Sequence, residues 1–283
     1  MSNAGHINPG SPRTCRLWVG TCGYSYTAWA EAGFYPPETK PGRMLPLYAR
    51  RFPLTELNHT WYQVPQAEAI ERQRQQAPPN FMFTAKLIRV LTHEPLTEVW
   101  RNQVAAFRHG LAPLIQSGQL AAVLVQLSRS FDRCVENRRH LALLLDELEG
   151  LSVAIEFRQG SWNTDRVLAE LERRGVTLVS ADLPDLPGLF PPLGVVTNPN
   201  LFYVRFHGRN ARGWRNGDRQ AQFDYNYRES ELREWIETRI APMAAQARHG
   251  IIVFNNHVRG QAPQNALLLG RLLRERGFAL GSD

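Results

Sequence analysis

Residues 120–156 read LAAVLVQLSRSFDRCVENRRHLALLLDELEGLSVAIE, and this stretch carries the pattern that decides the fold. Its two apolar runs, residues 120–126 and 152–156, are short and rich in Val, Leu and Ile. Such runs are typical of parallel strands that are covered on both faces. Residues 136–148 lie between them and repeat leucine at helical spacing. The stretch therefore predicts two parallel strands joined by a crossover helix.

The same unit recurs along the chain. Further strands are predicted at residues 16–20, 54–58, 81–87, 177–182, 201–207 and 250–255. Helical patterns occupy residues 67–76, 97–117 (with a kink at Pro113), 164–174, 230–247 (with Ser230 as N-cap) and 264–276. Residues 183–200 hold five prolines, so the sixth helix is expected to be short or missing. Eight alternations predict a single α/β domain, a (β/α)8 TIM-type parallel barrel. An open doubly wound sheet is the alternative, but no Gly-rich phosphate fingerprint follows the first strand.

Size and composition agree with one barrel domain. The chain has 283 residues, and such barrels run to about 250. We expect a polar tail over residues 1–14, without the apolar core of a secretory signal, and the barrel over residues 15–280. No apolar run is long enough for a membrane span. Three cysteines without a C-x-x-C pair speak against a disulfide framework or structural zinc and favour the reducing cytoplasm. The net charge of +7 is compatible with anionic partners.

Polar residues interrupt the strands near their carboxyl ends. Alternate side chains of a strand point to opposite faces. If the apolar face of each strand meets the helices, the polar face lines the barrel and opens at the carboxyl-terminal mouth, where barrel active sites lie. The alternative is that these groups are ion pairs that fill the lumen. The predicted catalytic residues are Glu56, Lys86, Glu156, Asp182 and His207, and the predicted substrate-binding residues are Asn58, Tyr62, His93, Gln126, Arg158, Arg205, Tyr227, Asn255 and Asn256.

Lys86 is conspicuous because Lys40 is the only other lysine in the chain. A lysine in a partly desolvated pocket can lose its proton, or can act as a cation for an oxyanion. The alternative is an ordinary ion pair with Glu56 or Glu156. In the same way, each predicted catalytic carboxylate could simply hold an arginine in place.

No cofactor is required by the sequence. A divalent metal held by Glu156, Asp182 and His207 is conceivable, although no diagnostic spacing supports it. A serine nucleophile is not favoured because the chain lacks a G-x-S-x-G elbow.

An arginine-rich segment, residues 209–227, follows the seventh strand. It interleaves cations with aromatic residues, namely Arg209, Arg212, Arg215 and Arg219 with Trp214, Phe223, Tyr225 and Tyr227. Arginines suit phosphate or carboxylate, and aromatic rings can stack on bases or sugars. The alternative is a solvated loop with a few packed aromatics.

Motifs spread over about residues 17–273 resemble those of the YecE-like family, catalogued as a domain of unknown function (number 72). They are Gly20-Thr21-Cys22-Gly23-Tyr24, Glu56-Leu57-Asn58-His59-Thr60-Trp61-Tyr62, Thr92-His93, Glu156-Phe157-Arg158, Arg205-Phe206-His207-Gly208 and Phe254-Asn255-Asn256. The resemblance implies a TIM-type barrel and supplies no reaction. Departures from the family pattern, at Cys22, Tyr24, His59, Ser128-Arg129 and Gln159, would lie beside the mouth and imply a substrate preference that differs within the family.

Three functional hypotheses follow. The first is an enzyme that uses acid/base chemistry on a small anion bearing phosphate or carboxylate. Glu156 or Glu56 would be the base, Lys86 and His207 the electrophile or acid, and Arg158 and Arg205 an anion clamp; hydrolase, isomerase and lyase chemistry stay open. The second is a nucleic-acid-associated protein that uses residues 209–227. The third is a binding module that retains a small ligand without turnover. Nothing in the sequence indicates an oligomeric state.

Overall fold

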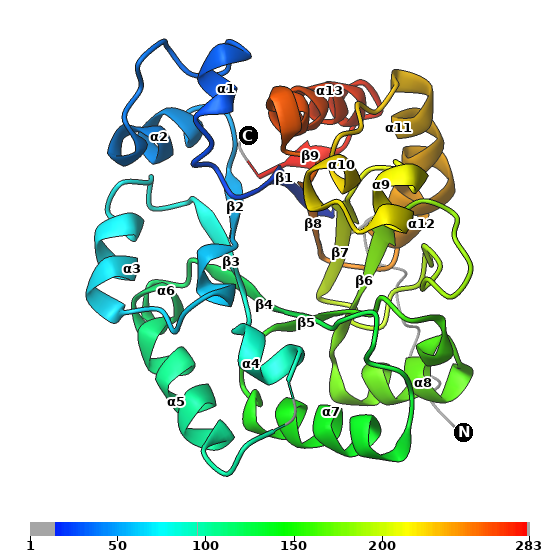
Figure 1. Ribbon diagram of the computed structural model, residues 1–283. Helices are drawn as coiled ribbons and strands as arrows, with labels where there is room; N and C mark the ends of the chain where they lie inside the picture. Colours follow the sequence, from blue (N-terminus) through cyan, green and yellow to red (C-terminus); the bar gives the residue numbers. More distant parts are fainter. Residues whose placement is uncertain (1–14, 95, 282–283) are drawn as a thin grey trace, which may run out of the picture.

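The computed structural model describes residues 15–94 and 96–281, and its centre is a closed barrel of eight parallel strands (Figure 1). Each strand pairs with its sequence neighbours, and β1 pairs with both β8 and β2 to close the cylinder. The strands are β1 (Arg16–Cys22), β2 (Leu54–Leu57), β3 (Met82–Lys86), β4 (Leu120–Gln126), β5 (Val153–Glu156), β6 (Thr177–Asp182), β7 (Leu201–Phe206) and β8 (His249–Phe254). Every predicted strand overlaps an observed one, and the predicted TIM-type barrel is confirmed.

Helices surround this barrel, most of them on its outside. They are α1 (Ala28–Glu31), α2 (Pro41–Tyr48), α3 (Ala67–Arg74), α4 (Arg89–Thr92), α5 (Trp100–Gly110), α6 (Ala112–Gln116), α7 (Val135–Glu147), α8 (Asp165–Arg174), α9 (Ala211–Asn216), α10 (Arg219–Gln222), α11 (Glu229–Trp235), α12 (Ala241–Ala244) and α13 (Gln261–Glu275). Short turns η1 (His59–Trp61), η2 (Gly160–Trp162) and η4 (Val258–Gly260) are 3₁₀-helical, and η3 (Ile236–Ile240) is a π-helix. As predicted, no helix joins β6 to β7 among the described residues of this connection.

Three elements differ in detail from expectation. The kink predicted at Pro113 is a break, because Leu111 separates α5 from α6 and Pro113 enters the first turn of α6, where its missing N–H costs nothing. Ser230 is not the N-cap of α11: Arg228 takes that position, and its backbone N–H donates to the Glu231 carboxylate at 2.8 Å. A ninth strand, β9 (Ala279–Leu280), was not predicted and pairs with β1 outside the barrel.

A second, smaller core fills the inside of the barrel and fixes which face of each strand points inward. Its members include Leu124 on β4, Ala154 on β5, Val179 on β6, Tyr203 on β7 and Val253 on β8. Side chains two positions further along a strand lie on the same face. The inner core therefore determines which polar residues reach the mouth.

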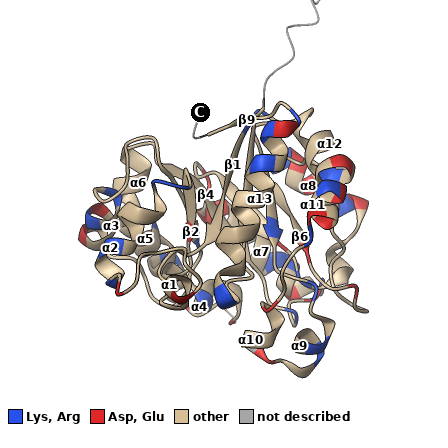
Figure 2. Cartoon of the chain, turned by 90° about the horizontal axis from the view of Figure 1, so that it is seen from above, with Lys and Arg blue, Asp and Glu red and all other residues tan. Residues whose placement is uncertain are grey.

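Charges of both signs are distributed over the outer helices, while α9 and α10 project from one end of the barrel (Figure 2). No helix within the described residues combines the length and the apolar character needed to cross a bilayer.

Candidate active site

A cavity of about 880 Å³ opens at the carboxyl ends of the strands. Its aromatic walls come from the segment after β1, from η1 and from the α9–α10 region: Tyr24, Tyr26, Trp61, Tyr62, Trp214 and Phe223. Its polar lining includes Glu56, Asn58, Lys86, Arg89, His93, Gln126, Arg129, Arg158, Arg205 and Asn255. Nine of the fourteen predicted site residues line this one cavity, namely Glu56, Asn58, Tyr62, Lys86, His93, Gln126, Arg158, Arg205 and Asn255.

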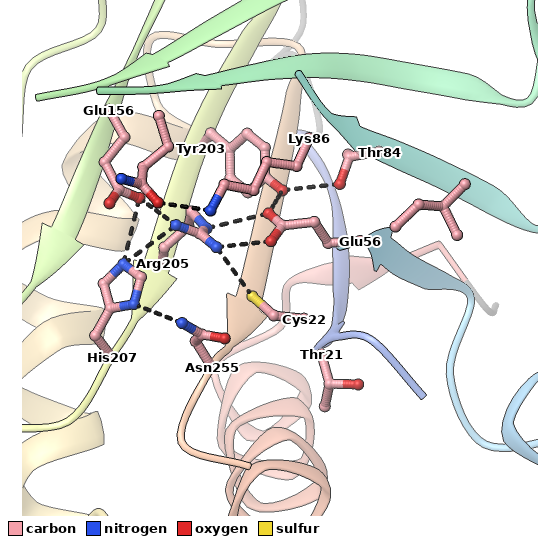
Figure 3. Close-up of polar contacts among 12 residues, drawn as sticks. Thr21, Cys22, Glu56, Thr84, Lys86, Glu156, Tyr203, Arg205, His207 and Asn255 are labelled. Atoms are coloured by element: carbon pink, nitrogen blue, oxygen red, sulfur yellow. Dashed lines mark hydrogen bonds and ion pairs between the residues drawn. The ribbon is translucent and has the colours of Figure 1, made fainter. Parts of the chain in front are cut away.

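The base of the cavity is a layer of four buried charged residues, Glu56, Glu156, Arg158 and Arg205, which we call the charged layer. Arg205 bridges both glutamates: its Nη2 lies 2.6 Å from Glu56 Oε1, and its Nη1 lies 2.5 Å from Glu156 Oε2. Arg158 Nε lies 2.5 Å from Glu156 Oε1. Figure 3 shows Glu56, Glu156 and Arg205 converging in the lumen. Two carboxylates thus neutralise two guanidiniums, as buried charges require.

Inner-core tyrosine Tyr203 supports this layer. Its hydroxyl donates to Glu56 Oε2 at 2.7 Å and is held in turn by Thr84 at 2.9 Å. Burial raises the pKa of Glu156, but the charges of Arg158 and Arg205 outweigh burial and hold this pKa well below its ordinary value. Glu156 is therefore a carboxylate at neutral pH. The arrangement matches the alternative in which each glutamate holds an arginine in place, and it does not suit either glutamate as the general base.

Lys86 lies above the charged layer, at the end of β3. Its Nζ donates to Gln126 Oε1 at 2.7 Å and sits 4.6 Å from the centroid of the Trp61 ring. No carboxylate of the described residues lies within ion-pair distance of Nζ, so the ion pair with Glu56 or Glu156 is not formed. Burial, and then the positive charge of Arg205, lower the pKa of Lys86 to about 7, against the opposing effect of the two glutamates. A large fraction of this amine is neutral at physiological pH.

His207 is completely buried between the charged layer and Asn255. Its Nε2 lies 3.3 Å from Glu156 Oε2 and 3.1 Å from Arg158 Nη2, and its Nδ1 lies 3.0 Å from Asn255 Nδ2. Burial, and then the charge of Arg158, lower the pKa of His207 to about 3. The ring is therefore neutral at physiological pH, so it holds its neighbours in place and does not act as a cationic acid.

His93 lies on the cavity wall, with its ring edge-to-face against Trp61 at 5.3 Å. Burial, and then the charge of Lys86, lower its pKa to about 4. Tyr62 stands at the rim with 72% of its surface exposed, where it can contact an incoming ligand.

Five predicted site residues do not line the cavity. Glu156 and His207 are buried at its base, whereas Asp182, Tyr227 and Asn256 lie away from it. Asp182 faces outward because Val179 is the inward residue on β6, which gives Asp182 the opposite face. Both of its carboxylate oxygens accept from Arg209 Nε at 3.0 Å. The expectation that Asp182 shares the lumen with the other polar residues is wrong, because the alternation places the apolar side of β6 inward.

Tyr227 and Asn256 also have structural partners away from the mouth. The Tyr227 hydroxyl accepts from the Gly208 backbone N–H at 2.8 Å, and its ring packs on Phe254 on the outside of the barrel. Asn256 Nδ2 donates to the backbone oxygen of Tyr225 at 2.8 Å and to Asn265 Oδ1 at 2.7 Å. Their predicted placement at the mouth is wrong.

The metal set suggested by the sequence is not assembled. Asp182 points away from Glu156 and His207, and the described residues contain no group of three His, Cys, Asp or Glu side chains placed to hold a metal ion. The residues present therefore do not fit that site.

The arginine-rich segment is not an open loop, because it folds into α9 and α10. Arg209 is bound to Asp182 and Glu231, and Trp214 is buried against Arg158 with 5.1 Å between the guanidinium carbon and the ring centroid. Arg212 and Arg215 are exposed, and the side chain of Arg219 lies outside what the structure describes. The segment thus supplies part of the cavity wall.

Sequence reasoning missed Trp61 and Tyr203 as site residues, and it considered Trp214 only as a ring that could stack on nucleic acid or sugar. Tyr203 stands two residues before Arg205, so strand alternation alone could have placed it on the same face. Trp61 and Trp214 lie outside the strands, where no periodicity indicates their direction.

Comparisons with known proteins agree with this architecture. A family model described as "Protein of unknown function DUF72" matches residues 18–282. The chain is 29% identical to the UPF0759 protein YunF of Bacillus subtilis over 262 residues, which are 87% of this chain and 93% of YunF.

Solved structures of two DUF72 family proteins are among those similar to this chain. The DUF72 family protein TM1631 of Thermotoga maritima has a TM-score of 0.83 and 32% identity, over 92% of this chain and 99% of that one. The DUF72 family protein EF0366 of Enterococcus faecalis has a TM-score of 0.80 and 30% identity, over 91% of this chain and 95% of that one.

Proposed function

The chain belongs to the DUF72 family of proteins of unknown function, and from that premise we propose that it is an enzyme acting on a small polar anion at the mouth of its barrel. The earlier resemblance to the YecE-like family is the same family and is confirmed. One observation carries the proposal: Lys86 has no acidic partner among the described residues and lies above a charged layer that is already neutral.

Anion binding follows from the charges that line the cavity. The lining contains Lys86, Arg89, Arg129, Arg158 and Arg205 against a single carboxylate, Glu56, which Arg205 already holds. A phosphate or carboxylate in this cavity would therefore meet an excess of positive charge. Some N–H groups of these cations are not used by their protein partners and can donate to the ligand. Arg158 suits the clamp role: its Nε is in ion-pair contact with Glu156 and its Nη2 contacts His207, while its Nη1 makes no hydrogen bond to a described residue.

In this proposal Lys86 is the group that accepts and donates protons during the reaction. Glu156 is held as a carboxylate by two arginines, and His207 is held neutral, so neither suits proton transfer near pH 7. Lys86, with a pKa of about 7, is the group whose protonation changes there. Isomerase, lyase and hydrolase chemistry are all compatible with these roles.

Binding and turnover test the proposal in two stages. Calorimetric titration with inorganic phosphate, pyrophosphate and citrate should show saturable binding that Arg158→Met weakens at least about tenfold, the loss expected for a buried charge-assisted contact. Arg212→Met, an exposed arginine on α9, is the matched control and should bind like the wild type. Mixtures of phosphorylated and carboxylated metabolites, followed by NMR, should then show a substrate that wild type consumes and Lys86→Met does not.

Binding without any turnover would leave the non-catalytic binding module as the better description. Equal affinity in wild type and Arg158→Met would contradict the anion site altogether.

The nucleic-acid hypothesis has weaker support. It needs aromatic rings free to stack, whereas Trp214 is buried and Tyr225 donates to Glu231 at 2.5 Å. Exposed Arg212 and Arg215 remain available for phosphates. A salt titration of DNA and RNA binding tests this hypothesis. Nucleic-acid affinity that depends on these arginines would fall steeply with salt, and it would also fall in the double variant Arg212→Ala/Arg215→Ala.

A further inference from the structure

We propose that Lys86 is a nucleophile that forms a covalent imine with an aldehyde or ketone group on the anionic substrate. This inference rests on the proposed function and deepens it, because it names the substrate class as anionic carbonyl compounds and gives Lys86 a covalent role.

The setting of Nζ is the first argument. Lys86 follows Thr84 on the inward face of β3, so its amine emerges into the open cavity just above the charged layer, close to Glu56 and Arg205 (Figure 3). A lysine that serves only as a structural cation would be expected to contact a carboxylate. Both nearby glutamates are occupied by arginines instead, and Nζ is left with a neutral acceptor, Gln126 Oε1, at 2.7 Å.

Gln126 is fixed in the orientation that suits this role. Its Nε2 donates to the backbone oxygen of Leu127 at 2.9 Å, so its Oε1 must face Lys86. An amide oxygen accepts one N–H of the amine and aims it, without stabilising the ammonium form as strongly as a carboxylate would. The nitrogen lone pair is then free to point into the cavity whenever the amine is neutral.

Neighbouring cations make the neutral amine accessible. Arg205 and Arg158 lower the pKa of Lys86 in addition to the effect of burial. Lysines that form imines are activated in the same way, by desolvation or by an adjacent cation.

Formation of the imine needs Lys86, the carbonyl compound and solvent water, and no other reactant. The lone pair of neutral Nζ attacks the carbonyl carbon, and a proton moves from nitrogen to the carbonyl oxygen to give a carbinolamine. The carbon–oxygen bond then breaks as the hydroxyl takes one proton from solvent water in the open cavity and leaves as water, and the hydroxide formed from the solvent water passes into bulk solvent. The product is a protonated imine, in which the carbon is linked to Nζ by a double bond and no oxidant or reductant has been used.

The chain offers a clean assay because it has only two lysines. Lys40 is exposed and serves as the internal control in the same molecule. Wild-type protein is incubated near neutral pH with glyoxylate, which bears a carboxylate, or with pyridoxal 5′-phosphate, which bears a phosphate. Borohydride then reduces any imine to a stable amine, and peptide mass spectrometry locates the adduct.

We expect labelling of Lys86 at least about tenfold faster than labelling of Lys40, since the neutral amine is the attacking species. Inorganic phosphate or pyrophosphate should slow labelling at Lys86 and leave Lys40 unchanged. Lys40→Arg should retain the adduct and Lys86→Arg should lose it. Preference for one probe would show whether the natural carbonyl compound bears phosphate or carboxylate.

Equal labelling of the two lysines by both probes, or labelling of Lys40 alone, would overturn the imine. The proposed anion site would survive that result if calorimetry still detects binding that depends on Arg158, and would fall with it otherwise. Because the wild-type protein carries its own control, the conclusion does not depend on the folding of any variant.

Discussion

Arg205 and Glu56 form a two-point ion pair across the inside of the barrel, with Nη2 2.6 Å from Oε1 and Nε 3.0 Å from Oε2. Neither side chain has more than 2% of its surface exposed. The pair links β7 to β2, which are not neighbours around the barrel. It therefore ties together opposite parts of the wall at the base of the cavity.

Replacing Arg205 should destabilise the protein severely. Arg205→Met leaves the buried carboxylates of Glu56 and Glu156 without their shared cation, and breaking a buried pair in this way costs about 3–5 kcal/mol. Urea denaturation at neutral pH measures the loss, with Arg212→Met as the exposed control. A loss below about 1 kcal/mol would mean that the pair behaves like a surface salt bridge.

The stability of Lys86→Met should depend on pH in a defined direction. Lys86 releases its proton near pH 7 in the folded chain and near 10.5 when unfolded. Between these values the unfolded chain binds more protons, so rising pH stabilises the wild type. Lys86→Met has no amine to titrate, so its free energy of unfolding lacks this pH dependence. The amount by which it exceeds the free energy of unfolding of the wild type should be largest below pH 7 and shrink toward pH 10.5.

Denaturation curves of both proteins at about pH 6 and about pH 9 check this sign. A stability difference that is the same at both values would show that Lys86 has an ordinary pKa.

Asp182→Asn should lower the free energy of unfolding and leave anion binding in the cavity unchanged. The carboxylate accepts two hydrogen bonds from Arg209 on the outer side of β6, and charge-assisted contacts of this kind are worth about 1.5–3 kcal/mol. Anion affinity, measured by calorimetry, should stay close to that of the wild type, in contrast to Arg158→Met. A large loss of affinity in Asp182→Asn would restore Asp182 to the site.

Gly213 should prove necessary for the cavity wall. A Cβ added there would lie 2.5 Å from the carbonyl carbon of Ala221 and 2.6 Å from the backbone nitrogen of Gln222, so Gly213→Ala must push α9 away from α10. We expect weaker anion binding and faster limited proteolysis near residue 213, because Trp214 moves with the helix. Arg215→Ala, on the same helix but exposed, should change neither. Unaltered proteolysis in Gly213→Ala would show that the contact relaxes at no cost.

Much of the fold follows from local patterns. Strand runs such as residues 120–126 and the helical leucine spacing that follows them predict a β/α unit, and eight units permit a closed parallel barrel. The missing sixth helix was equally visible, because the prolines after β6 cannot continue a helical hydrogen-bond ladder. Lys86 stood out because the chain uses arginine for nearly all of its cations.

Which face of each strand points into the barrel was decided by the tertiary structure. A period of two states which residues share a face, but not which face points inward. Closure of the barrel turned Gln126, Glu156 and Arg205 toward the lumen and turned Asp182 away from it.

By itself, then, the sequence determined the number and order of the eight barrel strands and the polar groups at their ends, because backbone preferences and burial depend on a few neighbouring residues. Only the tertiary structure decided that Arg205 would occupy both glutamates and leave Lys86 without an acidic partner. Those contacts join residues up to 149 positions apart, and their competition for one cation depends on distances that exist only after the barrel closes.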